Sequence, residues 1–553
     1  MRHFTLVLFV LSTIALSAQS DFYKNYHFTH ADTLRGSLRP QRTCFDVLHY
    51  GLYLRIDPKK KHISGHVDIK YAVEEDFTTL QLDLFQNMKI QRILFGQKEL
   101  KYDREANAVF VHFSEKQLKG NIDSLSVYYS GQPQEAHNPP WDGGFVWTED
   151  KKGRSWFAVA CEGDGASLWW PNKDHLSDEP DSMTISIAVP EKLTAICNGN
   201  LRAVTEDGNY VRYEWAVTYP IDNYNVTFNV GHYTQFSETY HSFDKDSMRM
   251  DFYVIDYNED KAKKHFQQTE EVLRSYEYYM GKYPFWNDGF ALVETPYLGM
   301  EHQGAIAYGN RYMRGYLGGM IPLDMDWDYI IVHETGHEYY GNSIGCSDLS
   351  EMWIQESFTT YLESLYVEYT MSKADAIRYL AGQKFYILNK EPIIGPKGVN
   401  FEDWSGSDHY FKGAWVLHTL RNAIGDDKEW FRLFHLLYQE NKLSQITSDD
   451  ITAFFNKNTK QEWNAFFDQY LRYPAIPIFQ YQIEENDTDI LVRYRWKADV
   501  SAFNMPVLIG KANHYQRVTP STSEWQEIIF LDTNSADFQV ATELFLVKTE
   551  RIL

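Results

Sequence analysis

The stretch Val332-His333-Glu334-Thr335-Gly336-His337 closes an apolar run that begins at Trp327. A run of this kind predicts a helix, and at helical spacing residues i and i+4 lie on one face. The imidazoles of His333 and His337 can therefore bind one Zn²⁺ together. Glu334 is rotated by about 100° from His333 around the helix axis. That angle is too large for a ligand on the same face, but it allows contact with a water on the metal.

A carboxylate further along the chain completes the candidate metal site. Eighteen residues separate His337 from Glu356, which lies in a second predicted helix. The histidine motif alone can arise by chance in a chain with 19 histidines. However, Glu356 is surrounded by aromatic and aliphatic neighbours, where an unpaired carboxylate would be costly to bury. The sequence therefore predicts one Zn²⁺ held by His333, His337 and Glu356, with an open position for water and Glu334 as the base.

Length and charge limit the class of protein. A chain of 553 residues exceeds one ordinary core, so we expect two to four domains. The formal net charge of −23 argues against a nucleic-acid partner, whose phosphates would be repelled, and favours a soluble protein. A solvated acidic surface accounts for this charge, and a preference for basic peptides is the alternative. The oligomeric state stays open.

The amino terminus has the pattern of an export signal. Residues 1–18 begin with a charged residue, Arg2, continue as an apolar run and end in the small residues Ala15, Ser17 and Ala18. We therefore expect a signal peptide over 1–18 and an exported protein, either periplasmic or secreted. The run is too short to cross a bilayer comfortably, and no later stretch approaches the ~20 apolar residues that a membrane span needs.

The four cysteines, at Cys44, Cys161, Cys197 and Cys346, contain no C-x-x-C pair. This pattern argues against a second metal site. Export permits disulfides without requiring them, and four cysteines allow three pairings. The sequence therefore assigns no disulfide.

Hydrophobic periodicity predicts a multidomain α+β protein in three parts. Short alternating runs between turns indicate an amino-terminal antiparallel β domain over 19–240. A mainly helical domain over 241–473 carries the zinc motif, and alternation returns over 474–553, which predicts a small carboxyl-terminal β-sandwich. In the two later domains we expect helices at 261–279, 326–340, 352–370, 374–388, 413–422 and 428–439, and strands at 479–483, 490–496, 525–531 and 544–548.

Further motifs narrow the chemistry. Leu298-Gly299-Met300-Glu301-His302-Gln303 precedes the zinc motif, and Tyr410-Phe411-Lys412-Gly413-Ala414 follows Glu356. With these motifs the chain resembles the aminopeptidase N and leukotriene hydrolase family of gluzincin metallopeptidases. That family has a G-x-M-E-N strand and a tyrosine in a Y-x-K-G-A setting. The segment from Cys161 to Pro171 is similar to one in the family's first β domain. The domain order agrees too, so the resemblance spans nearly all of the mature chain.

The resemblance implies a zinc aminopeptidase that removes amino-terminal residues from peptides, with a thermolysin-like catalytic domain. His333, His337 and Glu356 then bind the single zinc, as their spacing already predicts. Glu334 is the general base. Tyr410 is implied to donate a hydrogen bond to the oxyanion, a contact whose loss typically costs about 10²–10³ in rate.

The resemblance also implies a site for the substrate's free α-amine. Glu301 matches the family's amine-binding glutamate, and Glu162 matches a second acidic contact from the first β domain. Two carboxylates facing an ammonium group are physically reasonable, because a charged amine that enters a narrowing cleft must be paired. The chain departs from the family's usual residues at His302, Ala160 and Gln355. The first two replace amide side chains near the amine site, and we expect His302 to pack rather than titrate.

Alternatives to the aminopeptidase hypothesis remain. We expect the family's large helical carboxyl-terminal domain to be absent, because only about eighty residues follow Leu471. A more open cleft is expected, and an endopeptidase or a dual-function hydrolase could use the same zinc. A catalytically silent peptide-binding scaffold is a third hypothesis, against which the intact Glu334 and metal ligands argue. Side-chain preference and substrate length do not follow from the sequence.

Overall fold

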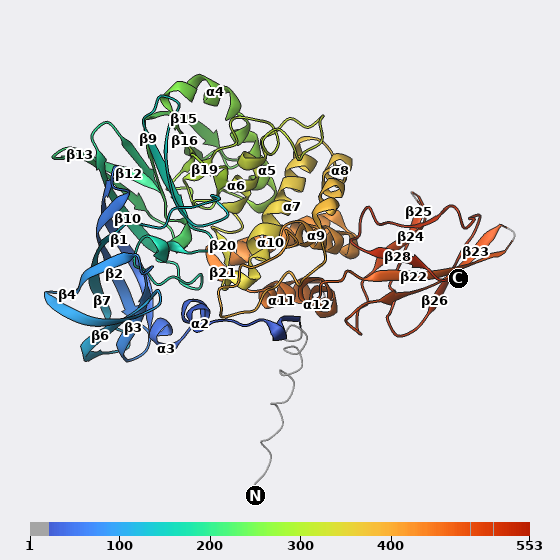
Figure 1. The fold of residues 1–553 in the computed structure, drawn as a ribbon. Helices are drawn as coiled ribbons and strands as arrows, with labels where there is room; N and C mark the ends of the chain where they lie inside the picture. Colours follow the sequence, from blue (N-terminus) through green and yellow to red (C-terminus); the bar gives the residue numbers. More distant parts are fainter. Residues whose placement is uncertain (1–21, 460, 487, 513) are drawn as a thin grey trace, which may run out of the picture.

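The computed structural model describes residues 22–459, 461–486, 488–512 and 514–553. The predicted signal peptide at 1–18 lies outside the described residues. Figure 1 shows β sheets on the amino-terminal side, a helical centre and a small β part at the opposite side. The protein is therefore a multidomain α+β protein, as the sequence predicts.

The amino-terminal part begins with a short helical segment and continues into a ten-stranded sheet. The helical segment comprises η1 (Tyr23–Asn25), α2 (His30–Gly36) and α3 (Pro40–Thr43). The sheet is mainly antiparallel, with β1 beside β10 as a parallel pair. Its strands are, in spatial order, β12 (Asn200–Asp207), β13 (Tyr210–Val217), β10 (Ser182–Pro190), β1 (Phe45–Asp57), β2 (His62–Val73), β7 (Ile122–Gly131), β4 (Met88–Phe95), β5 (Lys98–Glu105), β6 (Ala108–Gln117) and β3 (Phe77–Asp83).

A second sheet of this part positions Glu162. Its order is β11 (Thr194–Cys197), β14 (Phe228–Gly231), β9 (Ser155–Ala160) and β8 (Gly144–Glu149). The chain leaves β9 just before Glu162 and turns at Gly163 and Gly165, whose φ angles are +74° and +82°. Glycine adopts this region without steric cost. The turn therefore places Glu162 at the end of the sheet.

The central sheet joins the amino-terminal part to the helices. Its order is β15 (Tyr233–His241), β16 (Ser247–Ile255), β17 (Phe290–Glu294), β19 (Ile306–Tyr308) and β18 (Gly299–Met300), and β15 spans the predicted boundary at 240. Phe252 and Leu292 on one face belong to the core of the helical part, whereas Tyr253 and Val293 belong to the amino-terminal core. Glu301 follows β18 directly and so lies where the two parts meet.

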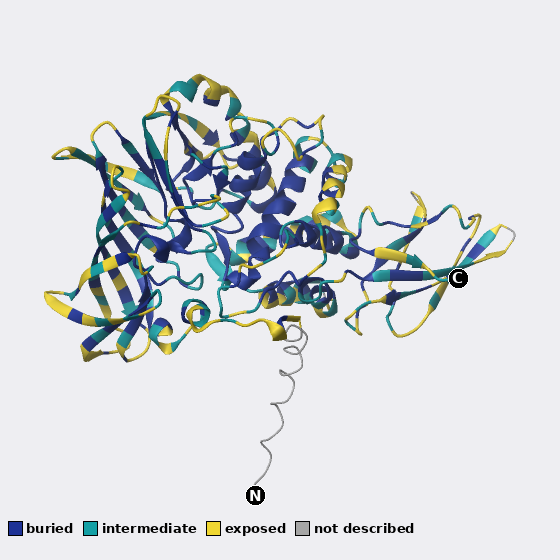
Figure 2. Ribbon diagram, in the orientation of Figure 1, coloured by how far each residue is buried: buried dark blue, intermediate teal, exposed yellow. Residues whose placement is uncertain are grey.

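Helices form the buried centre of the molecule. Figure 2 shows α6 and α7 almost wholly in the colour of buried residues. Two short strands, β20 (Ile344–Cys346) and β21 (Ser444–Ile446), pair among them. The helices are α4 (Glu259–His265), α5 (Gln268–Met280), α6 (Tyr329–His337), α7 (Trp353–Thr370), α8 (Lys373–Gln383), α9 (Phe411–Ile424), α10 (Asp427–Asn441), α11 (Ser448–Thr459) and α12 (Asn464–Arg472).

Two helices are shorter than predicted. The helix expected at 326–340 begins only at Tyr329, because the Asp328 side chain caps it, and it ends at His337 before the turn at Gly341 (φ +125°). The helix expected at 374–388 stops at Gln383 and is followed by η6 (Lys384–Tyr386). There the Asp408 carboxylate accepts bonds from two successive backbone N–H groups, at 388 and 389, that a helix would have used.

The helix expected at 261–279 is divided into α4 and α5. The division falls at Phe266, which is buried and packs against Phe252 with ring centroids 5.4 Å apart. The strand expected at 544–548 is also displaced, because the described strand β28 begins at Lys548. Before it, Leu546 docks on the helices: its N–H donates to Thr419 Oγ1 and its carbonyl accepts from the Tyr470 hydroxyl.

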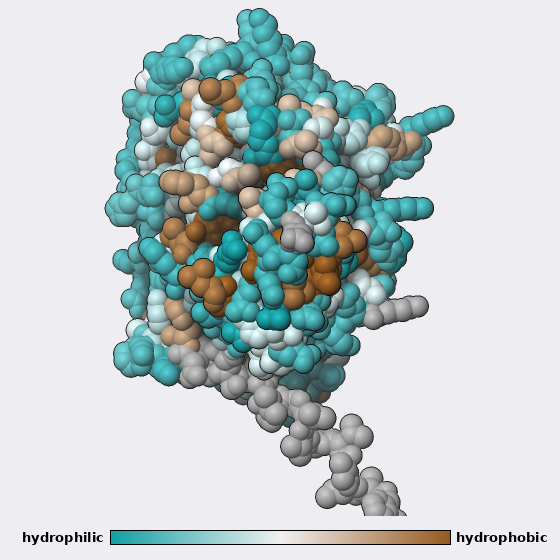
Figure 3. Space-filling model, turned by 90° about the vertical axis from the view of Figure 1, so that its right-hand side faces the viewer, coloured by the Kyte–Doolittle hydropathy of each residue, from teal (hydrophilic) through white to brown (hydrophobic). Residues whose placement is uncertain are grey.

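The carboxyl-terminal part is a small β-sandwich. One sheet contains β26 (Gln526–Phe530), β23 (Asp489–Lys497), β22 (Ile478–Asn486) and β28 (Lys548–Arg551), and the other contains β25 (His514–Val518), β24 (Val507–Lys511) and β27 (Phe538–Val540). Its core is continuous with that of the helices. Seen from this end, the surface is mainly hydrophilic, with apolar groups gathered toward the middle of the view (Figure 3).

Two further predictions concern membranes and cysteines. Among the described residues, no helix is long and apolar enough to cross a membrane. All four cysteines lie in the described part of the chain, and all four are buried free thiols. The disulfide pairings that the sequence leaves open are therefore not formed in this structure.

Candidate active site

The two histidines of the zinc motif face each other from helix α6. Asp328 fixes the start of this helix by accepting bonds from the backbone N–H groups of Ile330 and Ile331, at 2.9 and 3.3 Å. His333 and His337 follow on one face, with their Nε2 atoms 3.1 Å apart. The helical spacing predicted from the sequence thus produces the expected pair.

Glu356 joins the histidines from the first turn of α7. Its Oε2 atom lies 3.6 Å from His333 Nε2 and 3.3 Å from His337 Nε2. A tetrahedral ion with bonds of about 2.0–2.1 Å requires its ligand atoms to stand about 3.3 Å apart. The three side chains are buried and form a group able to hold one metal ion. Their spacing fits zinc.

The chemistry of the donor atoms also fits a cation. His333 Nδ1 lies 2.6 Å from Glu363 Oε1, and His337 Nδ1 lies 3.0 Å from the carbonyl of Tyr340. These acceptors place a proton on each Nδ1, so the facing Nε2 atoms present lone pairs to each other. Glu356 Oε2 is buried beside them without a hydrogen-bond donor among the described residues. A positive ion between the three atoms removes this repulsion, and zinc is the cofactor that this site holds.

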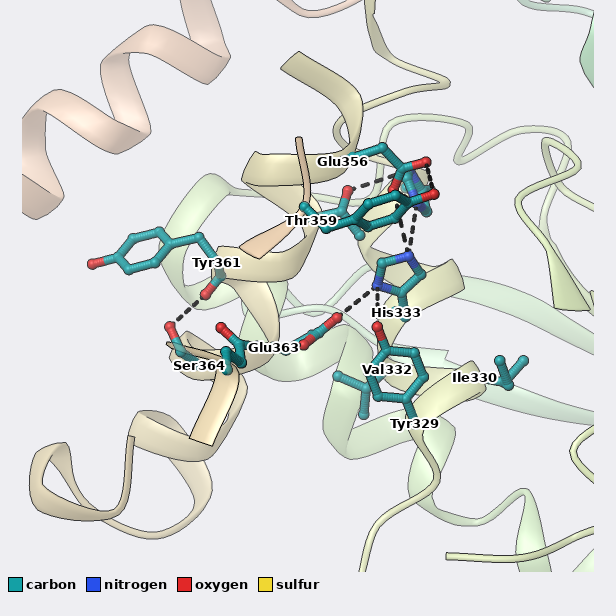
Figure 4. A network of polar contacts seen from close by, with 12 residues as sticks. Tyr329, Ile330, Val332, His333, Glu356, Thr359, Tyr361, Glu363 and Ser364 are labelled. Atoms are coloured by element: carbon teal, nitrogen blue, oxygen red, sulfur yellow. Dashed lines mark hydrogen bonds and ion pairs between the residues drawn. The ribbon is translucent and has the colours of Figure 1, made fainter. Parts of the chain in front are cut away.

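Glu363 orients the His333 ring, a role that was not predicted from the sequence. Figure 4 shows the His333 ring between Glu356 on one side and Glu363 on the other. The second oxygen of Glu363 accepts hydrogen bonds from the Tyr379 hydroxyl and from Gln383 Nε2. Glu363 follows Glu356 by two helical turns, so it lies on the same face of α7. That spacing is a signal from which it could have been found.

Glu334 lies beside the metal group but is not part of the first triad. A Cβ atom at Gly299 would stand 2.8 Å from Glu334 Oε1, so the glycine of β18 leaves room for this carboxylate. Ligand atoms of Glu334, Glu301 and His337 all lie within 4.8 Å of one another. Burial raises the pKa of Glu334 to about 8; Glu301 also raises it, while the two histidines lower it.

Tyr410 reaches the site because α9 packs closely on α7. Its hydroxyl donates to Glu356 Oε1 at 2.8 Å. A Cβ atom at Gly413 would lie only 1.6 Å from Ser357 Oγ, so this glycine allows the two helices to approach. Lys412 is buried and donates to the carbonyls of Tyr473 and Pro474, at the start of the sandwich. Lys412 and Gly413 of the motif around Tyr410 thus each have a structural reason.

The two candidate amine-binding carboxylates come from different parts of the fold. Glu301 accepts a hydrogen bond from the Tyr224 hydroxyl at 3.2 Å. Glu162 has one oxygen, Oε1, that is buried without a partner among the described residues. Burial raises the pKa of Glu162 well above its usual range, and the charge of Glu301 raises it further. The structure therefore places two carboxylates side by side, where a cation would stabilise both.

All seven predicted site residues line one cavity of about 770 Å³, namely Glu162, Glu301, His333, Glu334, His337, Glu356 and Tyr410. The departures from the family pattern lie elsewhere. His302 is fully buried outside the lining of this cavity, and burial lowers its pKa to about 3. Gln355 borders a smaller cavity behind Glu162. The site residues are thus brought together, and the departures do not touch the metal.

A histidine pair, a glutamate from the next helix and an adjacent carboxylate define the metal centre of a zinc metallopeptidase of the gluzincin class. The family models agree with this class. Residues 47–224 match the peptidase M1 N-terminal domain, and residues 257–470 match the peptidase family M1 domain. These segments cover more than half of the chain, which therefore belongs to peptidase family M1.

Known relatives are similar at low identity. The probable aminopeptidase 1 of Sulfurisphaera tokodaii is 18% identical over 448 residues, which are 77% of this chain and 53% of the relative. The endoplasmic reticulum aminopeptidase 2 of Homo sapiens is 21% identical over 266 residues, 45% of this chain and 27% of the relative. The chain thus spans about half of the first relative and less of the second.

A solved structure shares the fold. It is an M1 zinc metallopeptidase of Deinococcus radiodurans, a mutant bound to a Tyr-Ser-Ala substrate. It superposes with a TM-score of 0.65 and 20% identity, over 79% of this chain and 97% of that one. The likeness supports the arrangement of the β and helical parts described above.

Proposed function

We propose that this protein is a zinc aminopeptidase that releases single residues from the amino ends of peptides. The observation that carries the proposal is the closeness of Glu301 to the catalytic groups. A carboxylate oxygen of Glu301 lies within 4.8 Å of ligand atoms of Glu334 and of the zinc ligand His337. An α-amine held by Glu301 leaves room for little more than one residue before the metal. This geometry favours cleavage of the first peptide bond.

The positions of the other residues support the following roles. When bound, zinc supplies a Lewis acid that makes water a nucleophile near neutral pH. Glu334 takes a proton from the attacking water and delivers it to the leaving amine as the C–N bond breaks. Tyr410, which donates to Glu356 in this structure, turns its hydroxyl toward the developing oxyanion. Glu301 and Glu162 hold the α-ammonium group and so fix the register of the peptide.

An aminoacyl substrate and its N-acetylated form test the exopeptidase proposal directly. We expect hydrolysis of the free amine and a loss of about 10²-fold or more on acetylation, because the carboxylates then face a neutral group. Equal hydrolysis of both forms, or a preference for the acetylated one, would favour an endopeptidase and refute the proposal.

Two variants separate catalysis from amine binding. Glu334→Gln is expected to keep zinc, measured by metal analysis, and to lose about 10²–10⁴ in kcat. Glu301→Ala is expected to lose activity chiefly on substrates with a free amine, in kcat/KM. A Glu334→Gln protein as active as the wild type would contradict the assigned base.

We also propose that the protein is exported to the periplasm or beyond the cell. The support is the charged, apolar and small-residue pattern at 1–18. Cell fractionation of the full chain, followed by amino-terminal sequencing, checks this. Retention in the cytoplasm with residue 1 intact would contradict it.

A further inference from the structure

One wall of the active-site cavity is formed by the segment between η6 and α9. Glu402 and Asp403 lie on this wall and line the cavity. Neither carboxylate takes part in a hydrogen bond or in an ion pair within 4 Å in the described part of the chain. Their carboxylate oxygens are therefore available to a ligand.

Glu402 lies next to the amine-binding end of the cavity. A Cβ atom at Gly163 would stand 2.1 Å from Glu402 Oε2, so the carboxylate packs directly on this glycine. Gly163 follows Glu162, the candidate contact for the α-amine. The Glu402 carboxylate thus packs on the turn that carries Glu162, beside the place proposed to hold the substrate's amino end.

The same wall carries polar nitrogen atoms without protein partners. His409 is 8% exposed, lines the cavity and has no partner for Nδ1 among the described residues. Its ring stacks on Trp404, with centroids 4.7 Å apart, and the buried indole Nε1 of Trp404 is also without a partner. Buried polar groups are normally hydrogen-bonded. A water or a carbonyl oxygen of a ligand could accept from the indole N–H of Trp404, and a ligand donor or a water could pair with the His409 ring nitrogen.

The lining of the cavity is strongly unbalanced in charge. It contains Asp142, Glu162, Asp164, Glu301, Glu334, Glu356, Glu402 and Asp403, and no lysine or arginine among the described lining residues. Arg35 is the cation near Glu402, but its guanidinium donates to the carbonyl of Gly163. Four of these carboxylates already have a proposed role: Glu356 binds zinc, Glu334 is the base, and Glu301 and Glu162 hold the α-amine. A second positive charge on the substrate is the natural partner for the wall.

We propose that Glu402 selects peptides whose first residue is arginine or lysine, an inference that rests on the proposed aminopeptidase function. The long side chain of either residue carries its charge about 6 Å from Cα, far enough to reach a carboxylate that packs on the turn next to the amine site. The Glu402 carboxylate has no protein hydrogen bond to give up when it pairs with this charge. Trp404 and His409 form the polar and aromatic side of the same pocket.

Arginyl and citrullyl amides of one fluorophore test the charge alone, because the two side chains have nearly the same shape. For the wild type we expect kcat/KM for arginine to exceed that for citrulline by about 10- to 100-fold, the size of one charged hydrogen bond. In Glu402→Gln we expect this ratio to fall to near one. The ratio cancels any general loss of activity in the variant. Glu440→Gln, an exposed glutamate on α10, is the matched control and should keep the wild-type ratio.

The outcomes separate this inference from the proposed function. Efficient hydrolysis of alanyl or leucyl amides with an arginine-to-citrulline ratio near one would overturn the role of Glu402 and leave the aminopeptidase intact. A large ratio that Glu402→Gln does not change would also overturn it. If no free aminoacyl amide is hydrolysed, the proposed function fails and the inference fails with it.

Discussion

The two ends of the active-site cavity are built differently. At the zinc end, both histidine Nδ1 atoms and the second oxygen of Glu356 have protein partners, supplied by Glu363, Tyr340 and Tyr410. At the amine end, Glu162 keeps one buried oxygen without a partner among the described residues. The protein therefore pre-forms the metal centre, whereas under the proposed function the positive charge of the substrate would complete the amine end.

Removal of the Tyr410 hydroxyl, which contacts Glu356 at the zinc end, should have the largest effect. Tyr410→Phe keeps the ring and deletes the hydroxyl that donates to Glu356 at 2.8 Å. We expect kcat to fall by about 10²–10³, because an oxyanion donor is lost, with zinc content and KM nearly unchanged. Steady-state kinetics and metal analysis measure this. A Tyr410→Phe protein that loses zinc but turns over normally when zinc is resupplied would mean that the hydroxyl holds Glu356 and does not donate to the oxyanion.

Glu363 tests how far the zinc end depends on its protein partners. Glu363→Gln preserves the shape of the side chain but weakens its bond to His333 Nδ1, now 2.6 Å long. We expect zinc affinity to fall by about 10- to 100-fold, the usual effect of losing a carboxylate partner of a metal-binding histidine. Competition with a chromogenic chelator measures the affinity.

The control for this substitution lies on the same helix. Glu368→Gln changes a carboxylate near the end of α7 that pairs with Arg421 and lies outside the cavity lining. Its zinc affinity should equal that of the wild type. Equal zinc affinity of Glu363→Gln and wild type would mean that the packing of α6 on α7 orients the histidine without the Glu363 charge.

The same contrast explains what could be predicted from the sequence. The zinc end is local: helical periodicity puts His333 and His337 on one face, and Glu363 follows Glu356 by two turns of the same helix. The α+β domain order also follows from periodicity. Helix ends were less predictable, because Asp408 captures backbone N–H groups far from it in sequence, at 388 and 389.

The amine end could not be derived from local patterns. Glu162 and Glu301 were assigned through a family resemblance, and the spacing of these residues in the sequence carries no geometric signal. Their closeness results from packing of the central sheet between two hydrophobic cores. The contacts that hold the Glu162 turn are equally non-local: Arg35 is 128 positions from Gly163, and Asn400 is 237 positions away.

Arg35 should have the smallest effect of these residues, because it contacts only the backbone next to Glu162, at the carbonyl of Gly163. Its guanidinium and the Asn400 amide both donate to the Gly163 carbonyl, next to Glu162. We expect Arg35→Met to raise KM for free aminoacyl substrates by about 3- to 10-fold, the effect of one hydrogen bond. Zinc content and kcat should change little, since neither depends on this turn. Arg35→Lys, which can still donate one bond, should recover part of the loss.

The matched control for Arg35 is Arg39→Met, which removes a nearby arginine whose side chain does not cap α3. It should leave KM at the wild-type value. If Arg35→Met lowers kcat and thermal stability while KM stays constant, the arginine supports the fold and does not position Glu162. A rise in KM that Arg35→Lys partly reverses would show that a segment near the amino terminus sets the geometry of the amine end. The helices of the zinc end would then not depend on that segment.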